Sequence, residues 1–231
     1  NLKADSVRAE CEASLQRLGI DHIDLYQIHW PNDDERIEEG WAEISRLIEE
    51  GKVRYGGVSN FLDTHLERAQ KVHPVTSLQP PYSMMRRWIE DAEMPWCAAN
   101  NCGIVCYSPM QAGLLTDNFN EKKLADDDWR NQSKEHVEPN VSINLWFVDQ
   151  LRPMAAKYDT GVAQLALAWT LRRNEVTAAI AGARRPSQIE QTATASGIVI
   201  SDTDLASIDD LLAEREQRVR DIDGYILEIH R

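Results

Sequence analysis

The sequence predicts an α/β fold in which parallel strands alternate with helices, and specifically a (β/α)8 TIM barrel. Short β-favouring runs alternate with longer amphipathic runs along most of the 231 residues. Such alternation implies parallel strands joined by right-handed crossovers. No GxGxxG pattern follows any expected strand, so an open dinucleotide-binding sheet would lack its usual fingerprint. The barrel is therefore favoured over a doubly wound sheet.

The first elements are predicted from hydrophobic period and from start and stop signals. A helix is expected over residues 5–19, with Asp5 as its cap and Gly19 as its stop. Another helix is expected to start at a capping box formed by Thr64 and Glu67. By the same signals we expect strands at 20–30, 52–61, 76–83 and 103–110, and further helices at 36–51 and 90–101.

A long polar and acidic stretch, residues 111–140, interrupts the alternation and contains three consecutive aspartates at 126–128. Aperiodic segments of this length are usually lids, binding loops or disordered chain. We expect it to lie over the barrel mouth. After it the sequence predicts helices at 142–158 and 161–173, a strand at 176–183, and helices that begin near Pro186 and Ser201.

The number of strands falls short of a closed barrel. Five are predicted, whereas a barrel of this type has eight. Because the sequence begins at a helix, we expect residues 1–231 to form a single partial barrel domain. In this prediction strands 4–8 are represented and strands 1–3 are absent.

Composition excludes several classes of function. The formal net charge is −13, with acidic residues scattered along the chain, which argues against nucleic acid and anionic membranes as partners. No apolar run approaches the roughly 20 residues that span a bilayer, and the first residues lack signal-peptide features. The four cysteines are spaced unlike a zinc site. We therefore expect a cytoplasmic protein with reduced thiols and no metal.

Several polar residues are expected at the carboxyl ends of strands, where parallel barrels carry their reactive groups. His29 ends the run LYQIHWP. A neutral imidazole there can donate one hydrogen bond and accept another, which suits polarisation of a carbonyl group. A half-buried, hydrogen-bonded structural histidine is the alternative. Ser59 and Asn60 in GVSNF are equally compatible with ligand binding and with a turn that they form themselves.

Two later strand ends also offer binding groups. The side-chain amide of Gln79 can bind another amide, although it can equally be structural. Tyr107 is either a core aromatic or a flat surface for a planar ring. The segment AGARRPSQIEQT places Arg184 and Arg185 before a helix that starts with proline. Helix N-termini and arginines bind phosphate, so this is a candidate phosphate site; ordinary surface charge is the alternative.

The segments RLGIDHIDLYQIHWP, EEGKVRYGGVSNF, SLQPPYS, GIVCYSPMQAGLLT and AGARRPSQIEQ occur in this order along the chain. In order and spacing they resemble the aldo-keto reductases, in particular the bacterial branch of that family. The resemblance covers nearly the whole chain. It implies a barrel that binds NADP(H) across its mouth and reduces an aldehyde or ketone to an alcohol by hydride transfer.

The resemblance also implies residue roles. His29 matches the histidine that holds the substrate carbonyl. Apart from the matched positions, Trp30 and Trp129 are candidates for the substrate pocket, with packing of the acidic loop as the alternative for Trp129. The remaining matched positions share a role in cofactor binding. From the nicotinamide carboxamide and ring, through the ribose and pyrophosphate, to the 2′-phosphate and adenosine, they are Ser59, Asn60, Gln79, Tyr107, Ser108, Pro109, Met110, Gln111, Gly113, Leu114, Gly182, Ala183, Arg184, Arg185, Gln188, Gln191 and Thr192. Many relatives carry Glu and Asn at the last two positions, so the adenosine contacts depart from the family pattern.

The family's proton donor has no match in the sequence. The resemblance implies a tyrosine assisted by a lysine and an aspartate, on strands and loops before the first helix of this chain. A free tyrosine has a pKa of about 10 and needs such a cationic neighbour to act near neutral pH. Tyr26 and Tyr55 do not match the family position. We therefore expect these catalytic residues to lie outside the chain and the chain alone to be inactive.

Two alternatives remain open at this point. The chain could be a non-catalytic regulatory subunit on the same scaffold, like the cytoplasmic β subunits of potassium channels. It could also be an unrelated phosphate-binding barrel, such as a lyase or an isomerase. The sequence predicts a small-molecule carbonyl substrate without identifying it, and it predicts neither the direction of the reaction nor an oligomeric state.

Overall fold

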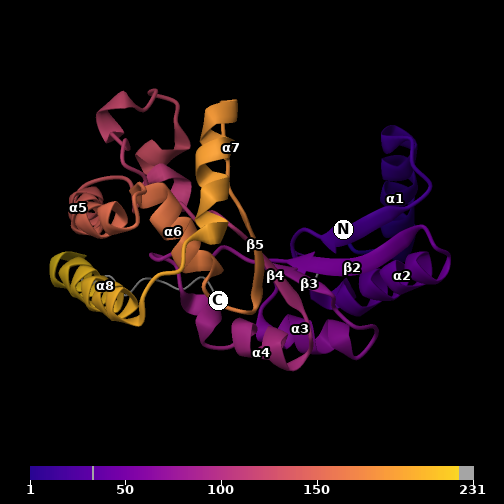
Figure 1. Cartoon of the computed structure of the whole chain (residues 1–231). Helices are drawn as coiled ribbons and strands as arrows, with labels where there is room; N and C mark the ends of the chain where they lie inside the picture. The colour runs from indigo at the N-terminus through magenta and orange to yellow at the C-terminus, as the bar shows by residue number, and fades with distance from the viewer. Residues whose placement is uncertain (33, 224–231) are drawn as a thin grey trace. The chain divides into compact units, whose positions relative to one another are not determined.

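A computed structural model describes residues 1–32 and 34–223 (Figure 1). The chain divides into two compact units. Unit 1 comprises Asn1–Pro81, Trp88–Cys106 and Glu175–Ala178, and unit 2 comprises Tyr82–Arg87, Tyr107–Asn174 and the chain from Ala179 onward. The expectation of one partial barrel domain stays a prediction.

A five-stranded sheet, in the order β1-β2-β3-β4-β5, confirms the α/β prediction. Neighbouring strands from β1 to β4 run parallel, so these strands end at the same edge of the sheet. The strands are β1 (Ile23–Ile28), β2 (Val53–Ser59), β3 (Ser77–Gln79), β4 (Gly103–Tyr107) and β5 (Val176–Ile180). The assignment of these five strands to positions 4–8 of a (β/α)8 barrel, with strands 1–3 absent, stays a prediction.

Four α-helices belong to unit 1: α1 (Ala4–Leu18), α2 (Ile37–Glu49), α3 (Asp63–Gln70) and α4 (Glu93–Ala99). Helix α2 packs on α1, on α3 and on strand β2. The contact with β2 requires glycine at position 56, because a Cβ atom there would lie 2.9 Å from the Trp41 ring. Trp41 is fully buried, and its indole nitrogen donates to the His73 carbonyl at 2.8 Å.

Two predicted helix starts are wrong in detail. Helix α1 begins at Ala4 with Lys3 as its N-cap, so Asp5 lies in the first turn instead of capping it. Helix α3 begins at Asp63, and Thr64 is inside it. There the His65 ring nitrogen Nδ1 accepts from the Leu62 backbone N–H at 3.2 Å, which replaces the expected Thr64 to Glu67 box. The stop at Gly19 is confirmed, since this residue has the left-handed φ of 65°.

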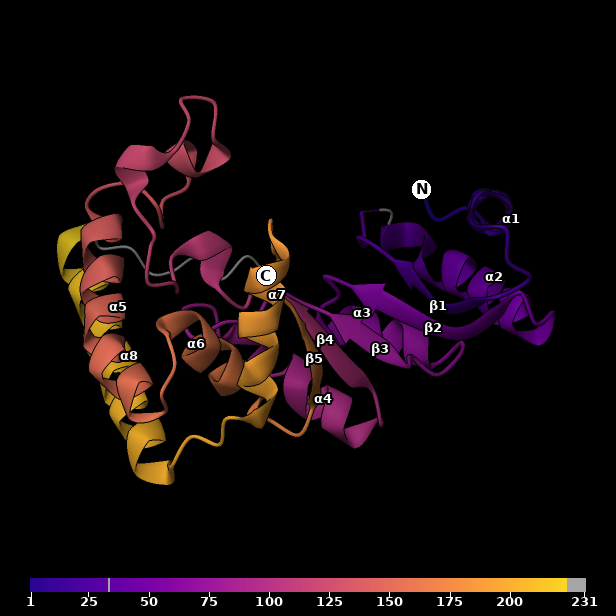
Figure 2. The same ribbon diagram turned by 45° about the horizontal axis from the view of Figure 1, so that its top comes forward.

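Unit 2 is largely helical. Its α-helices are α5 (Asn140–Lys157), α6 (Val162–Leu171), α7 (Pro186–Ala193) and α8 (Asp202–Asp223). Helices α5 and α8 lie side by side (Figures 1 and 2), α6 packs on α5, and α7 packs on α6. Pro186 occupies the first position of α7, as its missing N–H and fixed φ favour.

The acidic segment 111–140 contains no strand and is built from three short 3-10 helices: η3 (Gln111–Gly113), η4 (Glu121–Lys123) and η5 (Trp129–Gln132). Asn120 and Asp128 cap the last two through their side-chain oxygens. Asp117 accepts from the Arg152 guanidinium at 3.1 Å and from the Val162 N–H at 3.0 Å, which ties the segment to α5 and α6. Its expected position over a barrel mouth stays a prediction.

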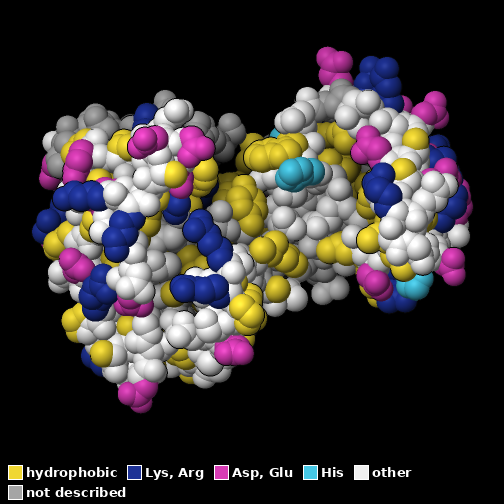
Figure 3. Space-filling model, turned by 90° about the horizontal axis from the view of Figure 1, so that it is seen from above, with side chains coloured by type: hydrophobic (Ala, Val, Ile, Leu, Met, Phe, Trp, Pro, Cys, Tyr) yellow, Lys and Arg dark blue, Asp and Glu magenta, His cyan; other side chains and the backbone are white. Residues whose placement is uncertain are grey.

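Surface charge is mixed in both units. On the face drawn in Figure 3, acidic side chains lie among basic ones over each unit, without a single large patch of one sign. All four cysteines are buried and free. Within residues 1–32 and 34–223 no helix is both long and apolar enough to cross a membrane, and no cluster of three or more His, Cys, Asp or Glu is placed to hold a metal.

Candidate functional site

The ends of β1 and β2 are joined through Asn60. Its side-chain nitrogen Nδ2 donates to the His29 carbonyl and to the Ser59 hydroxyl, both at 3.0 Å. Asn60 has a φ of 60°, a left-handed conformation that asparagine tolerates better than most residues. The structure therefore brings His29, Ser59 and Asn60 together at one edge of the sheet, as their positions at predicted strand ends required.

Gln79 joins the same cluster from β3. Its backbone carbonyl accepts from the Ser59 hydroxyl at 2.8 Å and from the Asn60 N–H at 3.2 Å. Its side-chain Nε2 donates to Gln27 Oε1 at 3.2 Å. Because an amide has one donor and one acceptor end, this bond leaves Oε1 as the acceptor of Gln79. Such an acceptor matches the N–H groups of a carboxamide.

The side chains of His29 and Trp30 are exposed at this edge, and 47% of Trp30 is accessible. The two rings are tilted at 45° with centroids 5.8 Å apart. The His29 backbone is fixed by Asn60, whereas its imidazole stays accessible for a ligand. An accessible imidazole can donate to or accept from a carbonyl oxygen according to its tautomer.

Tyr107, at the end of β4, is half-buried in unit 2 and its carbonyl accepts from the Tyr82 N–H at 3.1 Å. Burial raises the pKa of the Tyr107 hydroxyl, and nearby Arg86 partly opposes that rise. Tyr107 thus stays neutral at physiological pH. A neutral, half-buried phenol ring can stack on a planar ring.

The loop that follows, Ser108–Leu114, is conformationally unusual. Three of its non-glycine residues, Ser108, Gln111 and Ala112, have φ angles of 56°, 47° and 50°. Each left-handed non-glycine residue costs roughly 1–2 kcal/mol, so other contacts must hold the loop in this shape. Gln111 supplies some of them, because its side chain is 97% buried and bonded at both ends. The side chain of Gln111 is thus engaged in supporting the loop.

The segment Gly182–Gln188 is exposed and organised locally. Gln188 Oε1 accepts from the backbone N–H groups of Arg184 and Arg185 at 2.8 and 3.1 Å, which caps the start of α7. Both arginine side chains are exposed next to this helix N-terminus. The hydroxyl of Thr192 donates to the Gln188 carbonyl at 2.8 Å, and Gln191 is exposed on α7. Exposed cations at a helix start suit a phosphate ligand.

Trp129 is 63% exposed, and its ring meets the His136 ring edge-on at 5.7 Å. His136 itself is buried and also meets Phe119 edge-on at 5.6 Å. Burial lowers the pKa of His136 below 6.5. The aromatic cluster packs one part of segment 111–140 on another, while most of the Trp129 surface stays exposed.

A tyrosine, a lysine and an aspartate do meet in unit 2, but they have a structural task. Tyr158 and Lys157 each donate to Asp204 at 2.7 Å, and these contacts, with Lys157 first, hold the pKa of Asp204 below its usual range. Ser201, which precedes α8, exchanges hydrogen bonds with Asp204 as well. Because the Tyr158 proton is donated to a carboxylate at a helix start, this set is a cap and lacks an available acid.

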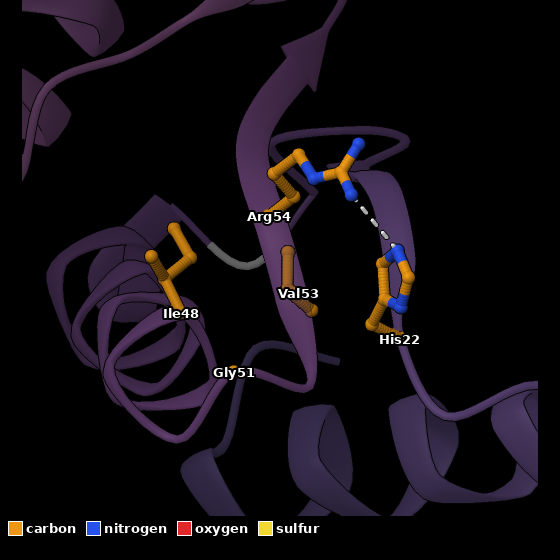
Figure 4. A pocket seen from close by; sticks show the side chains of 5 residues that line it. All are labelled: His22, Ile48, Gly51, Val53 and Arg54. Carbon is orange, nitrogen blue, oxygen red and sulfur yellow. Dashed lines mark hydrogen bonds between the residues drawn. The ribbon is translucent and has the colours of Figure 1, made fainter.

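A shallow pocket of unit 1 lies at the opposite ends of the strands (Figure 4). Arg54 donates to His22 Nε2 at 3.1 Å and to Asp24 at 2.6 Å, so the two polar side chains of this pocket, Arg54 and His22, are already hydrogen-bonded. The pocket is lined by His22, Ile48, Gly51, Val53 and Arg54. Since Val53 starts β2 whereas Ser59 ends it, the pocket is separate from the candidate site.

Sequence reasoning missed two residues that support the candidate site residues. Gln27 lies on β1, two residues before His29, which follows the strand. The two-residue period of strands could have identified it. Glu135 lies in an aperiodic segment, and no local pattern connects it with Gln111. Its role becomes visible only through the hydrogen bond at 2.6 Å that joins them.

Comparison with known proteins finds similarity over most of the chain. The model of the aldo/keto reductase family matches residues 1–213. Aldo-keto reductase YhdN of Bacillus subtilis (strain 168) is 34% identical over 205 residues, which are 88% of this chain and 62% of that protein. The NADH-specific methylglyoxal reductase of Escherichia coli (strain K12) is 32% identical over 219 residues, with coverages of 88% and 63%. The chain thus spans about three fifths of these relatives.

Solved structures are similar over most of the chain. The glycerol dehydrogenase AKR11B4 from Gluconobacter oxydans superposes with a TM-score of 0.88 at 32% identity, covering 93% of this chain and 66% of that one. The thermostable aldo-keto reductase Tm1743, solved with the inhibitor epalrestat, gives 0.73 at 27% identity, with coverages of 91% and 67%.

Proposed function

The chain belongs to the aldo/keto reductase family, and from this premise we propose that the protein reduces an aldehyde or a ketone to an alcohol with a nicotinamide cofactor. The cofactor supplies the hydride, and the protein supplies binding, orientation and electrostatics. An unrelated phosphate-binding barrel is no longer a candidate, because membership of this family contradicts it.

The observation that supports this proposal most strongly is the hydrogen-bonded cluster at the ends of β1, β2 and β3. In the proposal, the side chains of Ser59, Asn60 and Gln79 bind the carboxamide of the nicotinamide, with Gln79 Oε1 as acceptor. The ring of Tyr107 stacks on the nicotinamide, and His29 orients the carbonyl oxygen of the substrate. Bonds from Asn60 and Gln27 fix this cluster before any ligand arrives, which reduces the ordering required on binding.

The loops of unit 2 are proposed to bind the rest of the same cofactor. Ser108–Leu114 would contact the ribose and pyrophosphate, and Arg184, with Arg185 as second candidate, would bind the 2′-phosphate of NADP(H). Exposed guanidinium groups at a helix start support this assignment. The Escherichia coli relative is NADH-specific by name, so the preference for NADPH over NADH in this protein is a separate proposal and needs its own measurement.

The substrate is proposed to be a small carbonyl compound that contacts His29, Trp30 and Trp129. Methylglyoxal is a reasonable first probe, since it is named for the Escherichia coli relative. The proton donor implied by the family resemblance stays unassigned in this chain, and its location outside the chain stays a prediction. A cytoplasmic location stays a prediction as well.

The proposal is tested by cofactor binding and turnover in one preparation. Quenching of tryptophan fluorescence by NADPH and by NADH gives both dissociation constants, and loss of absorbance at the nicotinamide band in the presence of methylglyoxal gives turnover. Asn60→Ala should lower the affinity for both cofactors on the order of tenfold. It removes a side chain that is proposed to bind the carboxamide and that also holds the cluster in place. Asp24→Asn, at the opposite strand ends, is the control.

The outcomes separate the possibilities. Absence of binding to either cofactor would refute the proposal. Binding without turnover, together with a stable complex with a larger partner, would indicate the regulatory alternative. Strong turnover by the 231-residue chain alone would show that the expectation of an external proton donor is wrong.

A further inference from the structure

The strained loop Ser108–Leu114 is held by residues that come from the other end of segment 111–140. Its two consecutive left-handed residues, Gln111 and Ala112, are each fixed by a different side chain of that segment. This arrangement points to a task for the acidic segment besides covering a substrate.

Glu135 fixes Gln111. The Gln111 Nε2 donates to Glu135 Oε2 at 2.6 Å, and Gln111 Oε1 accepts from the Ser83 hydroxyl at 2.6 Å. The other carboxylate oxygen of Glu135 accepts from Arg86 at 3.2 Å. Gln111 is 97% buried and both ends of its amide are hydrogen-bonded. Loss of either partner would leave a buried polar group unsatisfied, so Glu135 and Ser83 together stabilise this conformation.

Arg130 fixes Ala112. Its Nη1 donates to the Ala112 carbonyl at 3.1 Å, while Nε and Nη2 are held by Asp128 at 2.9 and 2.6 Å. A guanidinium clamped by a carboxylate keeps its remaining donor in one direction. The carbonyl of the left-handed residue is thereby satisfied by a fixed partner in place of mobile solvent.

The backbone of Glu135 is itself held by two residues of the helices α5 and α8. Its backbone carbonyl accepts from Asn144 Nδ2 at 2.8 Å, and Asn144 Oδ1 accepts from Arg215 Nε at 2.7 Å. Asn144 and Arg215 are both buried, on α5 and α8. The support of the loop therefore reaches the helical core of unit 2, and Glu135 is its last member before Gln111.

We infer that Glu135 is a positioning residue for cofactor binding: through Gln111, and with Arg130 acting on Ala112, it holds Ser108–Leu114 in the conformation that receives the dinucleotide. This inference rests on the proposed function, which assigns that loop to the ribose and pyrophosphate. Those groups occur in NADPH and in NADH alike. Loss of Glu135 therefore weakens the binding of both cofactors equally, whereas loss of a 2′-phosphate contact weakens the binding of NADPH alone.

A swap of donor and acceptor tests the bond directly. E135Q leaves one acceptor oxygen at position 135 for two donors, Gln111 Nε2 and Arg86. Q111E places a carboxylate against Glu135, so each single change disrupts this set of contacts. The double variant E135Q/Q111E restores it in reverse, with the new amide at 135 donating to the new carboxylate at 111. Asp127→Asn removes one acidic charge from the exposed part of the same segment and is the matched control.

Two readouts are measured in the full chain. The first is the dissociation constant for NADPH and for NADH, by tryptophan fluorescence. The second is hydrogen exchange of the amides at 113–115, which donate within the loop and report its order without any cofactor. Each single variant should lose on the order of tenfold in affinity for both cofactors, exchange faster at 113–115, and keep the ratio of the two affinities. The double variant should recover both properties, and D127N should match the unchanged protein.

Other results overturn the inference in distinguishable ways. If the unchanged protein binds both cofactors and E135Q binds them equally well, the inference fails and the proposed function stands. The same holds if the double variant recovers neither affinity nor slow exchange, or if exchange rises while affinity is unchanged. If the unchanged protein binds neither cofactor, the proposed function fails and the inference fails with it.

Discussion

Two loops of unit 2 carry proposed cofactor contacts, and they reach their conformations in different ways. The segment Gly182–Gln188 is exposed and is organised by its own sequence, through Gln188 and the proline that starts α7. The loop Ser108–Leu114 is strained and is held by side chains from segment 128–135. The conformation of the first loop can therefore be predicted from the local sequence, whereas that of the second depends on tertiary contacts.

The largest effect is expected at Asn144, which supports the loop Ser108–Leu114 from α5. Asn144→Ala removes the partner of the buried Arg215 guanidinium and of the Glu135 carbonyl. Two groups lose hydrogen bonds, and one of them is the buried charged guanidinium, so we expect a loss of about 2–4 kcal/mol in the free energy of unfolding. Urea denaturation measures it, with Ser142→Ala, on the exposed face of the same helix, as control. A loss as small as the control's would mean that the network does not support unit 2.

The opposite loop is tested through its charge. Arg184→Ala should lower the affinity for NADPH by about tenfold or more and leave the affinity for NADH unchanged. Only NADPH carries the 2′-phosphate that a guanidinium binds. Dissociation constants for both cofactors check this, and Arg185→Ala, at the neighbouring exposed arginine, shows which of the two reads the phosphate. Equal losses for the two cofactors after Arg184→Ala would contradict the assignment.

The local character of Gly182–Gln188 predicts a small effect of its capping residue. Gln188→Ala removes the acceptor of two backbone N–H groups that are exposed to solvent in the variant. As for other helix caps, the expected loss is about 1 kcal/mol in the free energy of unfolding. Urea denaturation beside Asn144→Ala provides the direct comparison, and a larger loss from the cap would reverse the distinction between the loops.

The smallest expected effect is a dependence on pH in the segment that supports Ser108–Leu114. Burial keeps the pKa of His136 below 6.5; Glu135 and Asp128 oppose this, Arg130 adds to it, and the Gln111 backbone also opposes it. Between the folded pKa and pH 6.5, His136 is therefore protonated in the unfolded chain and neutral in the folded chain. Stability is full above pH 6.5, falls as the pH drops from there to the folded pKa, and is constant below it.

Melting temperatures between pH 8 and pH 5 measure this contribution. His136→Phe keeps an aromatic ring against Phe119 and Trp129 but cannot take up a proton, so its melting temperature should decline less over that range. An identical decline in both proteins would show that another group causes it.

Much of the fold follows from local signals, and the site follows in part. Period and punctuation predict the alternation of strands and helices, and the left-handed Gly19 and the first-turn Pro186 occur where single-residue preferences place them. Once strands are known to be parallel, His29, Ser59, Asn60 and Gln79 must gather at one edge. The helix caps predicted at Asp5 and Thr64 are wrong, because competing partners nearby decide which residue caps a turn.

By itself the sequence determined the class of fold, the family, and the residues at the strand ends, because each depends on patterns a few residues long or on motifs in order. Tertiary structure alone decided which partners hold those residues: Gln111 meets Glu135 across 24 positions and Asn144 meets Arg215 across 71. A buried hydrogen bond is selected by what the whole chain brings together and shields from water, and no local pattern encodes that choice.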